Sequence, residues 1–575
     1  MHHCYQFYFV RNRKIRRRSI VFASVLALLL FGCGRARARL TTAYDAEQVV
    51  AGWLQADPRP LGTTLGRWVT NVETFTGDNG GPVYYIVYLK PSGFVIVPAD
   101  DLVEPIIGFA DDGTYGTSSE HPLAALVTAD LNGRVAAART EAYPDAGIGT
   151  LTVPEVRQKW HNFITLAETT KDKLVSMSAG SIPDVRVEPL IESKWNQAGV
   201  CGNDCYNYYT PNNYYTGCVA TTMAQLMRYH QHPATGIGIH DFTVEIDGSP
   251  HTASTRGGDG YGGPYNWSDM VLDPDCSTTD MQRRAIGALC YDAGISVNME
   301  YTGDGSAADT LEAKDALTAT FKYSNAVNGF RIGGNIGSEL IAMINPNLDC
   351  GRPVILGLAQ EDGGHAVLCD GYGYSDETLY HHLNMGWSGY DDVWYNLPDV
   401  DAELHTYTSV VSCVYNIFVS GNGEIISGRV TDASGNPVTG ATVTAEGKGG
   451  PYYATTNARG IYALAKVASA STFTVSVAKA GYLFTDQDVT TGTSGARRAV
   501  SGNRWEVDVV GVLVGDFDAD SDVDAADLAL LALAWLTEPG DVEWNPACDI
   551  STPADNLIDA RDFAIFTNNW HAGVK

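Results

Sequence analysis

The chain has 575 residues, enough for about three to five domains of ordinary size. Hydrophobic residues make up 45% of it and aromatic residues 10%, so packed cores are expected and general disorder is not. The formal net charge of −29 argues against nucleic acid as a partner, because phosphate binding requires a basic surface.

Residues 1–38 have the pattern of an export signal. Six basic residues lie between Arg11 and Arg18, and Ser19–Gly32 is an apolar stretch of 14 residues, too short to span a bilayer comfortably. Ala36-Arg37-Ala38 offers a cleavage site, whereas Leu30-Phe31-Gly32-Cys33 resembles a lipoprotein box. Cleavage after Ala38, lipidation of Cys33 and a retained anchor are therefore all open. No later segment of the sequence is apolar and long enough to cross a membrane.

Eleven cysteines are few for this length, so we do not expect a disulfide-rich scaffold. Cys201 and Cys205 either pair locally or are idle thiols. No cysteine or histidine cluster has the spacing of a zinc site.

Residues 39–184 are expected to form an α+β domain of their own. The apolar stripe of Thr42–Leu54 predicts a helix. Val83–Leu89 and Gly93–Val97 are β-rich runs joined by a hairpin signal, and Ile106–Phe109 is a further short strand. Pro154–Ser176 has helical spacing and suits a connector.

Residues 185–420 are expected to form a second α+β domain. Gly217–His230 has the spacing of a helix. The later part predicts four strands: Pro353–Leu358, Ala366–Asp370, Tyr380–Asn384 and Val393–Leu397. A leading helix followed by a set of strands is typical of this fold class.

Residues 424–510 predict a β-sandwich, because short strands recur at the spacing of such folds. The expected strands are Ile425–Val430, Ala441–Ala445, Tyr452–Thr456, Ile461–Ala465 and Phe473–Ala478. Residues 515–572 form a twofold repeat of an acidic loop followed by a helix, Ala525–Trp535 and then Ala560–Trp570.

Cys218 is a candidate nucleophile because it opens the predicted helix directly after Gly217. A helix N-terminus and a nearby protonated histidine both lower the pKa of a thiol, and the thiolate is the reactive form. His365 follows two glycines at the start of an apolar run, which places an imidazole at the mouth of a strand. When each residue is considered alone, Cys218 is more simply interpreted as a buried apolar residue and His365 as a structural histidine.

Asn384 is a candidate third member, because a side-chain amide can accept from the second imidazole nitrogen. Trp387 follows it and offers an aromatic shield. The order Cys, His, Asn with long gaps is typical of a papain-like fold.

These segments resemble the streptopain family of cysteine peptidases. The match comprises Thr216–Thr221 with Met223–Gln225, Gly364–Val367 with Asp370–Tyr372, and Lys194–Gln197. The strand pair in residues 84–97 resembles the family's inhibitory prodomain. The resemblance covers about residues 45–110 and 185–418.

The resemblance implies that Cys218 is the nucleophile and His365 the general base and acid. It also implies that Gln197 and the Cys218 backbone N–H form the oxyanion hole, and that Asn384 orients His365. The family usually has tryptophan where this chain has Met385, so the shielding ring is absent or Trp387 takes its place.

Two C-terminal resemblances complete the chain. Residues 424–500 resemble a carboxypeptidase regulatory-like β-sandwich. Residues 511–575 resemble a type I dockerin, an all-α calcium-binding module with a cohesin-like partner. The carboxylates of the first loop have the spacing of calcium ligands, and those of the second are irregular. The candidate ligands are Asp516, Asp518, Asp520, Asp522 and Asp527 in the first loop and Asp549, Ser551, Asp555, Asp559 and Asp562 in the second.

The expected architecture is therefore multidomain: signal peptide 1–38, prodomain 39–184, papain-like domain 185–420, β-sandwich 424–510 and dockerin-like domain 511–575. The expected function is a secreted or cell-surface cysteine endopeptidase, made as a zymogen, that cleaves protein or peptide substrates and needs no cofactor for catalysis. The alternative is a non-catalytic, dockerin-bearing adhesion scaffold built on a protease-like fold. Another papain-fold reaction, such as amide transfer, is a third reading, since the same thioester serves it.

Overall fold

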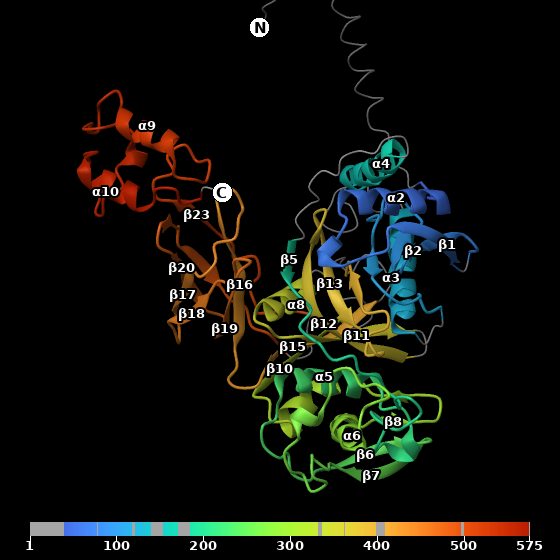
Figure 1. Ribbon diagram of the computed structural model, residues 1–575. Coiled ribbons are helices and arrows are strands. Elements are labelled where there is room, and N and C mark those ends of the chain that lie inside the picture. The colour runs from blue at the N-terminus through green and yellow to red at the C-terminus, as the bar shows by residue number, and fades with distance from the viewer. Residues whose placement is uncertain are drawn as a thin grey trace, which may run out of the picture.

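The computed structural model describes residues 39–77, 79–117, 121–139, 153–170, 184–331, 336–337, 339–360, 363–397, 409–495 and 499–573. The predicted export signal lies outside the described residues, as does the predicted connector beyond residue 170. Within the described ranges, no helix has both the length and the apolar character needed to cross a bilayer. Figure 1 shows the N-terminal region in blue against the green and yellow central region, with the orange and red C-terminal parts to one side.

In its described residues, the N-terminal region contains three α-helices and four strands. They are α2 (Ala43–Ala56), β1 (Trp68–Thr76), β2 (Pro82–Lys90), β3 (Phe94–Pro98), β4 (Gly108–Ala110), α3 (Pro122–Arg139) and α4 (Val153–Thr170). The predicted first helix begins at Ala43 because Thr42 and Asp45 form a reciprocal capping box before it. The predicted hairpin is β2 paired with β3. Strand β1 and helix α3 were not predicted.

The central region contains the expected helix and strands. Its elements are β5 (Asp184–Val187), α5 (Cys218–His230), β6 (Asp241–Ile246), β7 (Ser249–Ser254), α6 (Asp280–Ser296), β8 (Glu300–Tyr301), β9 (Ser306–Ala307), α7 (Glu312–Asp315), β10 (Asn325–Phe330), α8 (Glu339–Asp349), β11 (Val354–Gln360), β12 (Gly363–Ser375), β13 (Thr378–Asn384), β14 (Val393–Tyr395) and β15 (Val410–Phe418). Strand β12 is much longer than predicted, because it pairs with β11, β13 and β5 along its length.

One sheet joins the N-terminal and central regions. Its 11 strands run in the order β1-β2-β3-β4-β14-β13-β12-β11-β15-β10, with β5 paired to β12. The junction is antiparallel pairing of β4 with β14, in which Phe109 lies opposite Trp394 and Gly108 opposite Tyr395. The sequence predicts two α+β units but gives no sign that their sheets are continuous, because strand pairing between distant segments leaves no local pattern.

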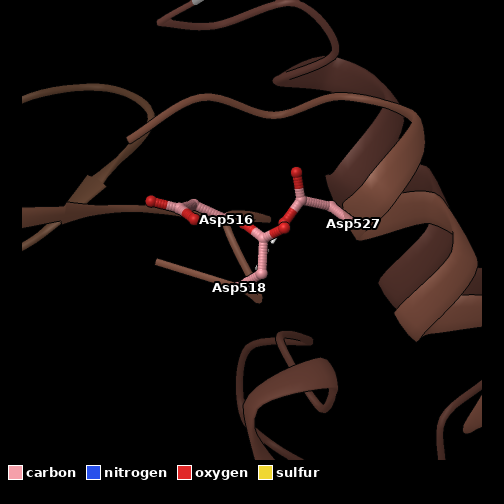
Figure 2. Close-up of side chains that lie close together, drawn as sticks. All are labelled: Asp516, Asp518 and Asp527. Atoms are coloured by element: carbon pink, nitrogen blue, oxygen red, sulfur yellow. Dashed lines mark hydrogen bonds between the residues drawn. The ribbon is translucent and has the colours of Figure 1, made fainter. Parts of the chain in front are cut away.

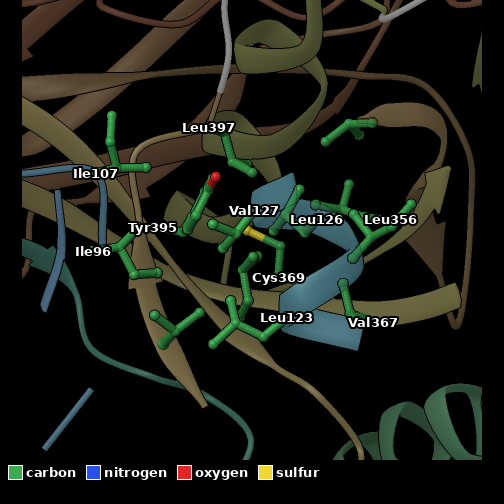
Figure 3. Close-up of a cluster of buried hydrophobic side chains, with 14 of the residues drawn as sticks. Ile96, Ile107, Leu123, Leu126, Val127, Leu356, Val367, Cys369, Tyr395 and Leu397 are labelled. Carbon is green, nitrogen blue, oxygen red and sulfur yellow. The ribbon is translucent and has the colours of Figure 1, made fainter. Parts of the chain in front are cut away.

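The two regions also share a hydrophobic core. Helix α3 places Leu123, Leu126 and Val127 in the same cluster as Val367 and Cys369 of β12. Figure 3 shows these side chains meeting between the helix and the sheet. The N-terminal region is therefore packed into the central region and is not a loosely tethered unit.

A buried ion pair reinforces this contact. Arg134 Nε donates to Asp130 Oδ1 at 2.8 Å within α3, and both side chains are almost completely buried. Asp130 Oδ2 accepts from the Tyr395 hydroxyl at 2.8 Å, and Arg134 donates to Asn396 Oδ1 at 2.7 Å. The pair is therefore satisfied only while α3 lies against β14.

The disulfide differs from the sequence interpretation. Cys201 is bonded to Cys276, 75 residues away, and Cys205 is a buried free thiol. Of the two options that the sequence leaves open, local pairing of Cys201 with Cys205 is wrong, whereas the idle thiol is confirmed for Cys205 and not for Cys201. The bond ties the segment before α5 to the segment before α6.

The predicted β-sandwich consists of two four-stranded sheets, β19-β16-β23-β21 and β18-β17-β20-β22. The strands are β16 (Glu424–Asp432), β17 (Thr442–Gly447), β18 (Tyr452–Thr455), β19 (Ile461–Val467), β20 (Thr472–Ala478), β21 (Tyr482–Leu483), β22 (Gln487–Thr490) and β23 (Val509–Leu513). It contacts the central region directly. Asn503 and Asn416 exchange side-chain hydrogen bonds of 3.0 and 3.1 Å, and the Trp505 ring lies 6.0 Å from that of Tyr372.

The C-terminal repeat has the two predicted helices, α9 (Ala525–Leu533) and α10 (Ala560–Asn568). Leu531 and Phe566 are buried in one small core, whereas Leu528 and Phe563 are partly exposed. Both helices begin with an aspartate capping box, Asp524 with Asp527 and Asp559 with Asp562. The two halves therefore have the same local construction.

The buried pair yields a stability prediction. Replacing Arg134 by alanine leaves the Asp130 carboxylate buried without its cation, which costs about 3–5 kcal/mol. We expect R134A to lower the melting temperature of the full chain and to loosen the docking of α3. Asp280 and Arg284 form the same i,i+4 pair on an exposed helix surface, so R284A is the matched control and should change little. Equal melting temperatures for R134A and R284A in calorimetry would contradict this view of the interface.

Candidate active site

Cys218 is the first residue of helix α5, as the sequence predicts. Gly217 caps the helix with φ of 88°, and a Cβ there would lie 2.6 Å from Met299 Cε, so only glycine fits. No side chain caps this end of the helix. The N–H groups of the first turn are thus available to a negative charge at the Cys218 sulfur or beside it.

His365 lies on β12 and faces Cys218. The charge of His365 acts on the Cys218 sulfur, and hydrogen bonding to His365 and to the backbone N–H groups of Ala366 and Val219 also favours the thiolate. Thr222, one turn further along α5, donates from its hydroxyl to the Ala366 carbonyl at 3.1 Å. This buried bond joins the helix to the strand beside the two candidate residues and sets their separation.

The environment favours the thiolate of Cys218. Burial raises the pKa of this thiol, but the charge of His365, its hydrogen bond and the two backbone N–H groups outweigh burial and leave the pKa below its ordinary value. Cys218 is nevertheless half-buried rather than enclosed, so a small molecule can reach it.

For each of the other free cysteines in the described residues, the pKa of the thiol is raised and not lowered. Burial raises the pKa of Cys205 to about 12 and that of Cys548 to about 11. Burial also raises the pKa of Cys290, Cys350, Cys369 and Cys413. Within the described part of the chain, Cys218 is therefore the free cysteine best suited to act as a nucleophile.

Gln197 lies beside the start of α5. Its carbonyl accepts from the Thr216 N–H at 2.9 Å, two residues before Cys218. The preceding residues are bonded to the loop after β13: the Trp195 carbonyl accepts from the Ser388 N–H, and Asn196 Nδ2 donates to Ser388 Oγ at 2.9 Å. The segment that carries Gln197 is therefore held between the helix and this loop.

Asn384 ends β13 next to the strand of His365, but its side chain is engaged elsewhere. Its Oδ1 accepts from Gln225 Nε2 at 3.0 Å and from the Gly386 N–H at 3.1 Å, and its Nδ2 donates to the Ser193 carbonyl at 3.3 Å. His365 Nε2 is buried without a hydrogen-bond partner. In the described residues, the expected Asn384 contact to His365 is therefore not formed.

Trp387 contacts the N-terminal region. Its ring lies 4.6 Å from that of His121, and His121 Nε2 is 2.8 Å from Asp391 Oδ2. Met385, which stands where the streptopain family usually has tryptophan, is buried in the shared core. The start of helix α3 thus rests on the loop that carries Trp387.

The first acidic loop brings some of its predicted ligands together. Asp516, Asp518 and Asp527 place carboxylate oxygens within 4.8 Å of one another, as do Asp522, Asp524 and Asp527. Figure 2 shows the first group, with Asp527 projecting from α9 toward the loop. Asp522 Oδ1 is buried without a partner, which suits a cation ligand. Asp520 belongs to neither group; its Oδ1 accepts from the Asp522 N–H.

The second acidic loop does not gather its carboxylates in this way in the described residues. Asp562 is equivalent to Asp527: each is buried and accepts three backbone N–H bonds from its own loop. Asp549 accepts from Ser551 Oγ and the Asn556 N–H, Asp559 caps α10, and Asp555 pairs with Arg561.

Sequence reasoning missed Thr222 and Gln225. Both lie on the face of α5 that carries Cys218, four and seven residues after it, and both are buried polar side chains. The available signal was the spacing of these polar residues, together with Thr221, along the buried side of the helix. No sequence signal indicated the contact between His121 and Trp387, because these residues are far apart in the sequence.

A thiolate held by an imidazole at the N-terminus of a helix is the chemistry of a cysteine-dependent acyl-transfer enzyme. Comparison with known proteins narrows this class. Residues 195–395 match the Peptidase C10 family, residues 38–132 match the Spi protease inhibitor family, and residues 425–501 match the carboxypeptidase regulatory-like domain.

Named relatives agree with these matches. Streptopain of Streptococcus pyogenes serotype M1 is 25% identical over 346 residues, which are 56% of this chain and 75% of streptopain. The thiol protease/hemagglutinin PrtT of Porphyromonas gingivalis is 29% identical over 302 residues, 52% of this chain and 32% of PrtT. A fragment of Prevotella intermedia prointerpain A aligns with 60% of this chain at 22% identity and a TM-score of 0.43.

The chain is thus a cysteine peptidase. Its peptidase region is similar to the Peptidase C10 family, of the streptopain type, with a region similar to the Spi protease inhibitor before it and a region similar to the carboxypeptidase regulatory-like domain after it.

The environment of Cys218 predicts a change in its reactivity. In His365→Ala the opposing effects of the imidazole are lost and burial remains, so the pKa of the Cys218 thiol rises. Alkylation of Cys218 by iodoacetamide should then need a higher pH, and each unit of pKa shift should slow it about tenfold at acidic pH. His251→Ala, on the exposed strand β7, is the control. An unchanged pH profile of alkylation in H365A would contradict the assignment.

Proposed function

We propose that this protein is an exported cysteine endopeptidase in which Cys218 is the nucleophile and His365 the general base and acid. The observation that carries the proposal is the position of Cys218 at the uncapped start of α5, where the charge of His365 and hydrogen bonding help to bring the pKa of the thiol below its ordinary value. The scaffold alternative has no need of a lowered thiol pKa.

The proposed reaction follows from these groups. The Cys218 thiolate attacks the carbonyl carbon of the scissile peptide bond, and the carbonyl oxygen becomes an oxyanion. The Cys218 backbone N–H and the Gln197 side chain donate to that oxygen. His365 protonates the leaving amine, which gives a thioester, and then takes a proton from the water that hydrolyses it.

Asn384 and Trp387 are proposed to support His365. Asn384 ends the strand next to β12, and Trp387 follows it in the same loop. In this structure, which includes the prodomain, Asn384 is bonded to Gln225 and Trp387 lies against His121 of the prodomain. We infer that the prodomain restrains the loop that carries Trp387, and that its removal frees this loop for substrate.

Export is supported by two features. The sequence has a basic and then apolar leader that ends near Ala38, with Cys33 as the alternative lipid-bearing residue, although these positions lie outside the described residues. The Cys201–Cys276 disulfide suits an oxidising compartment. A prodomain is useful to such an enzyme because it limits digestion of the proteins of the producing cell.

The C-terminal repeat is proposed to be a dockerin-like module that binds calcium. Asp516, Asp518, Asp522 and Asp527 would be the principal ligands, and oxygen ligands of this kind suit calcium. The second loop, with Asp549, Ser551, Asp555, Asp559 and Asp562, would bind more weakly because its spacing is irregular. A cohesin-like partner is proposed for this module. In support, Leu533, Leu536 and Val542 are exposed on its surface.

The catalytic assignment predicts that Cys218→Ala abolishes proteolysis, because no other group supplies the nucleophile. The variant precursor should stay unprocessed if activation is autocatalytic. Cys350→Ala, a half-buried free thiol far along the chain, is the control and should digest casein normally. Casein digestion by C218A at the wild-type rate would show that Cys218 is not the nucleophile.

The calcium assignment predicts that calcium protects residues 514–573 of the full chain from added chymotrypsin, whose aromatic cleavage sites are spread along this segment, and that a chelator removes the protection. Residues 511–575 hold 13 acidic and two basic side chains, so like-charge repulsion opposes folding until a dication reduces it. Asp516→Ala should weaken protection more than Asp549→Ala. Cleavage patterns that do not change with calcium would contradict the calcium assignment and would mean that the repeat only presents an acidic surface.

A further inference from the structure

Gln225 occupies an unusual place in the peptidase domain. It is a polar side chain, 1% exposed, on the buried face of the nucleophile helix, two turns after Cys218. Burial of an amide is favourable only when its donors and acceptors are satisfied. Its partners therefore indicate why it is there.

These partners belong to the two segments that complete the active site. Gln225 Oε1 accepts from Ser193 Oγ at 2.9 Å and from the Trp195 N–H at 3.2 Å, two residues before Gln197. Gln225 Nε2 donates to Asn384 Oδ1 at 3.0 Å. A further bond from Asn384 Nδ2 to the Ser193 carbonyl closes the ring.

Backbone donors set the orientation of both amides. The Trp195 N–H can only donate, so the atom of Gln225 that faces it must be oxygen, and the nitrogen then faces Asn384. In the same way the Gly386 N–H requires the oxygen of Asn384 to face it. Neither amide can be flipped without breaking at least two bonds in the ring.

We propose that Gln225 is a positioning residue for the peptidase reaction: it connects the helix of Cys218 both to the segment of Gln197 and to Asn384. This inference rests on the proposed roles of those residues. Gln225 does not touch substrate. It sets where the oxyanion donor and the Asn384 loop lie relative to the sulfur, and a displacement of about 1 Å at such groups can cost up to a hundredfold in rate.

The first test compares kcat and KM of the processed enzyme. Gln225→Met retains the length of the side chain but removes all three bonds, so we expect kcat to fall at least tenfold with little change in KM. Asn347→Leu is the matched control, because it removes a buried, hydrogen-bonded amide from helix α8 at the contact with the β-sandwich. It should lower the melting temperature and leave kcat unchanged. Equal kcat values for Q225M and wild type would overturn the proposal, as would an equal loss in N347L.

The second test uses the pH profile of Gln225→Glu. An ionised carboxylate accepts from Ser193 and Trp195 but cannot donate to Asn384. When protonated, it can donate again. The hydrogen-bonding partners of Gln225 are all neutral, and burial favours the protonated form. The ratio of kcat in Q225E to kcat in wild type should therefore rise as the pH falls. A ratio independent of pH would contradict the role of the donated bond.

A double-mutant cycle separates this inference from the proposed function. If Gln225 acts through Asn384, Q225M should cost less kcat in the N384A background than in the wild-type background. Full additivity would overturn the connection to Asn384. If C218A retained wild-type activity, the proposed function itself would fail. If C218A is inactive while Q225M is fully active, only the inference about Gln225 fails.

Discussion

The active site depends on the packing of helix α5 against strand β12. The Thr222 hydroxyl donates to the Ala366 carbonyl at 3.1 Å, so the first turn of the helix and the strand of His365 have a defined separation. Gly217 directly precedes the helix, and glycine is required there because the φ of 88° and the adjacent Met299 leave no room for a side chain. Together, the charge of His365, hydrogen bonding to it and the backbone N–H groups of Ala366 and Val219 outweigh the effect of burial on the pKa of the Cys218 thiol. The lowered pKa of the Cys218 thiol thus depends on this helix–strand contact.

The same strand connects the site to the rest of the molecule. Strand β12 lies within a sheet of 11 strands that begins in the prodomain. On one side of β12, Val367 and Cys369 pack in the core that includes helix α3, and near the start of α3 His121 lies against Trp387. The prodomain is therefore joined to the peptidase domain by continuous packing as well as by the contact of His121 with Trp387. Its release must expose apolar surface, which opposes activation and keeps the precursor stable.

The sequence predicted what local patterns encode. The start of α5 at Cys218, the β2–β3 hairpin and helices α9 and α10 all follow from periodicity, capping and turn residues. It did not predict the pairing of β4 with β14 or the Cys201–Cys276 bond, because both depend on distant segments meeting. Cys218 and His365 were brought together as expected. The hydrogen bond between Asn384 and Gln225 was not predicted, because the sequence does not show whether Gln225 or His365 lies within hydrogen-bonding distance of the Asn384 amide.

The most direct test of the central claim is to map a thiol-directed peptide epoxide on the processed enzyme. One equivalent should abolish proteolysis, and peptide mass spectrometry should find the adduct on Cys218. It should not be found on Cys205, Cys290, Cys350, Cys369, Cys413 or Cys548, because burial raises the pKa of each of those thiols. Complete labelling of Cys218 with proteolysis retained, or loss of activity with the adduct on another cysteine, would contradict the account.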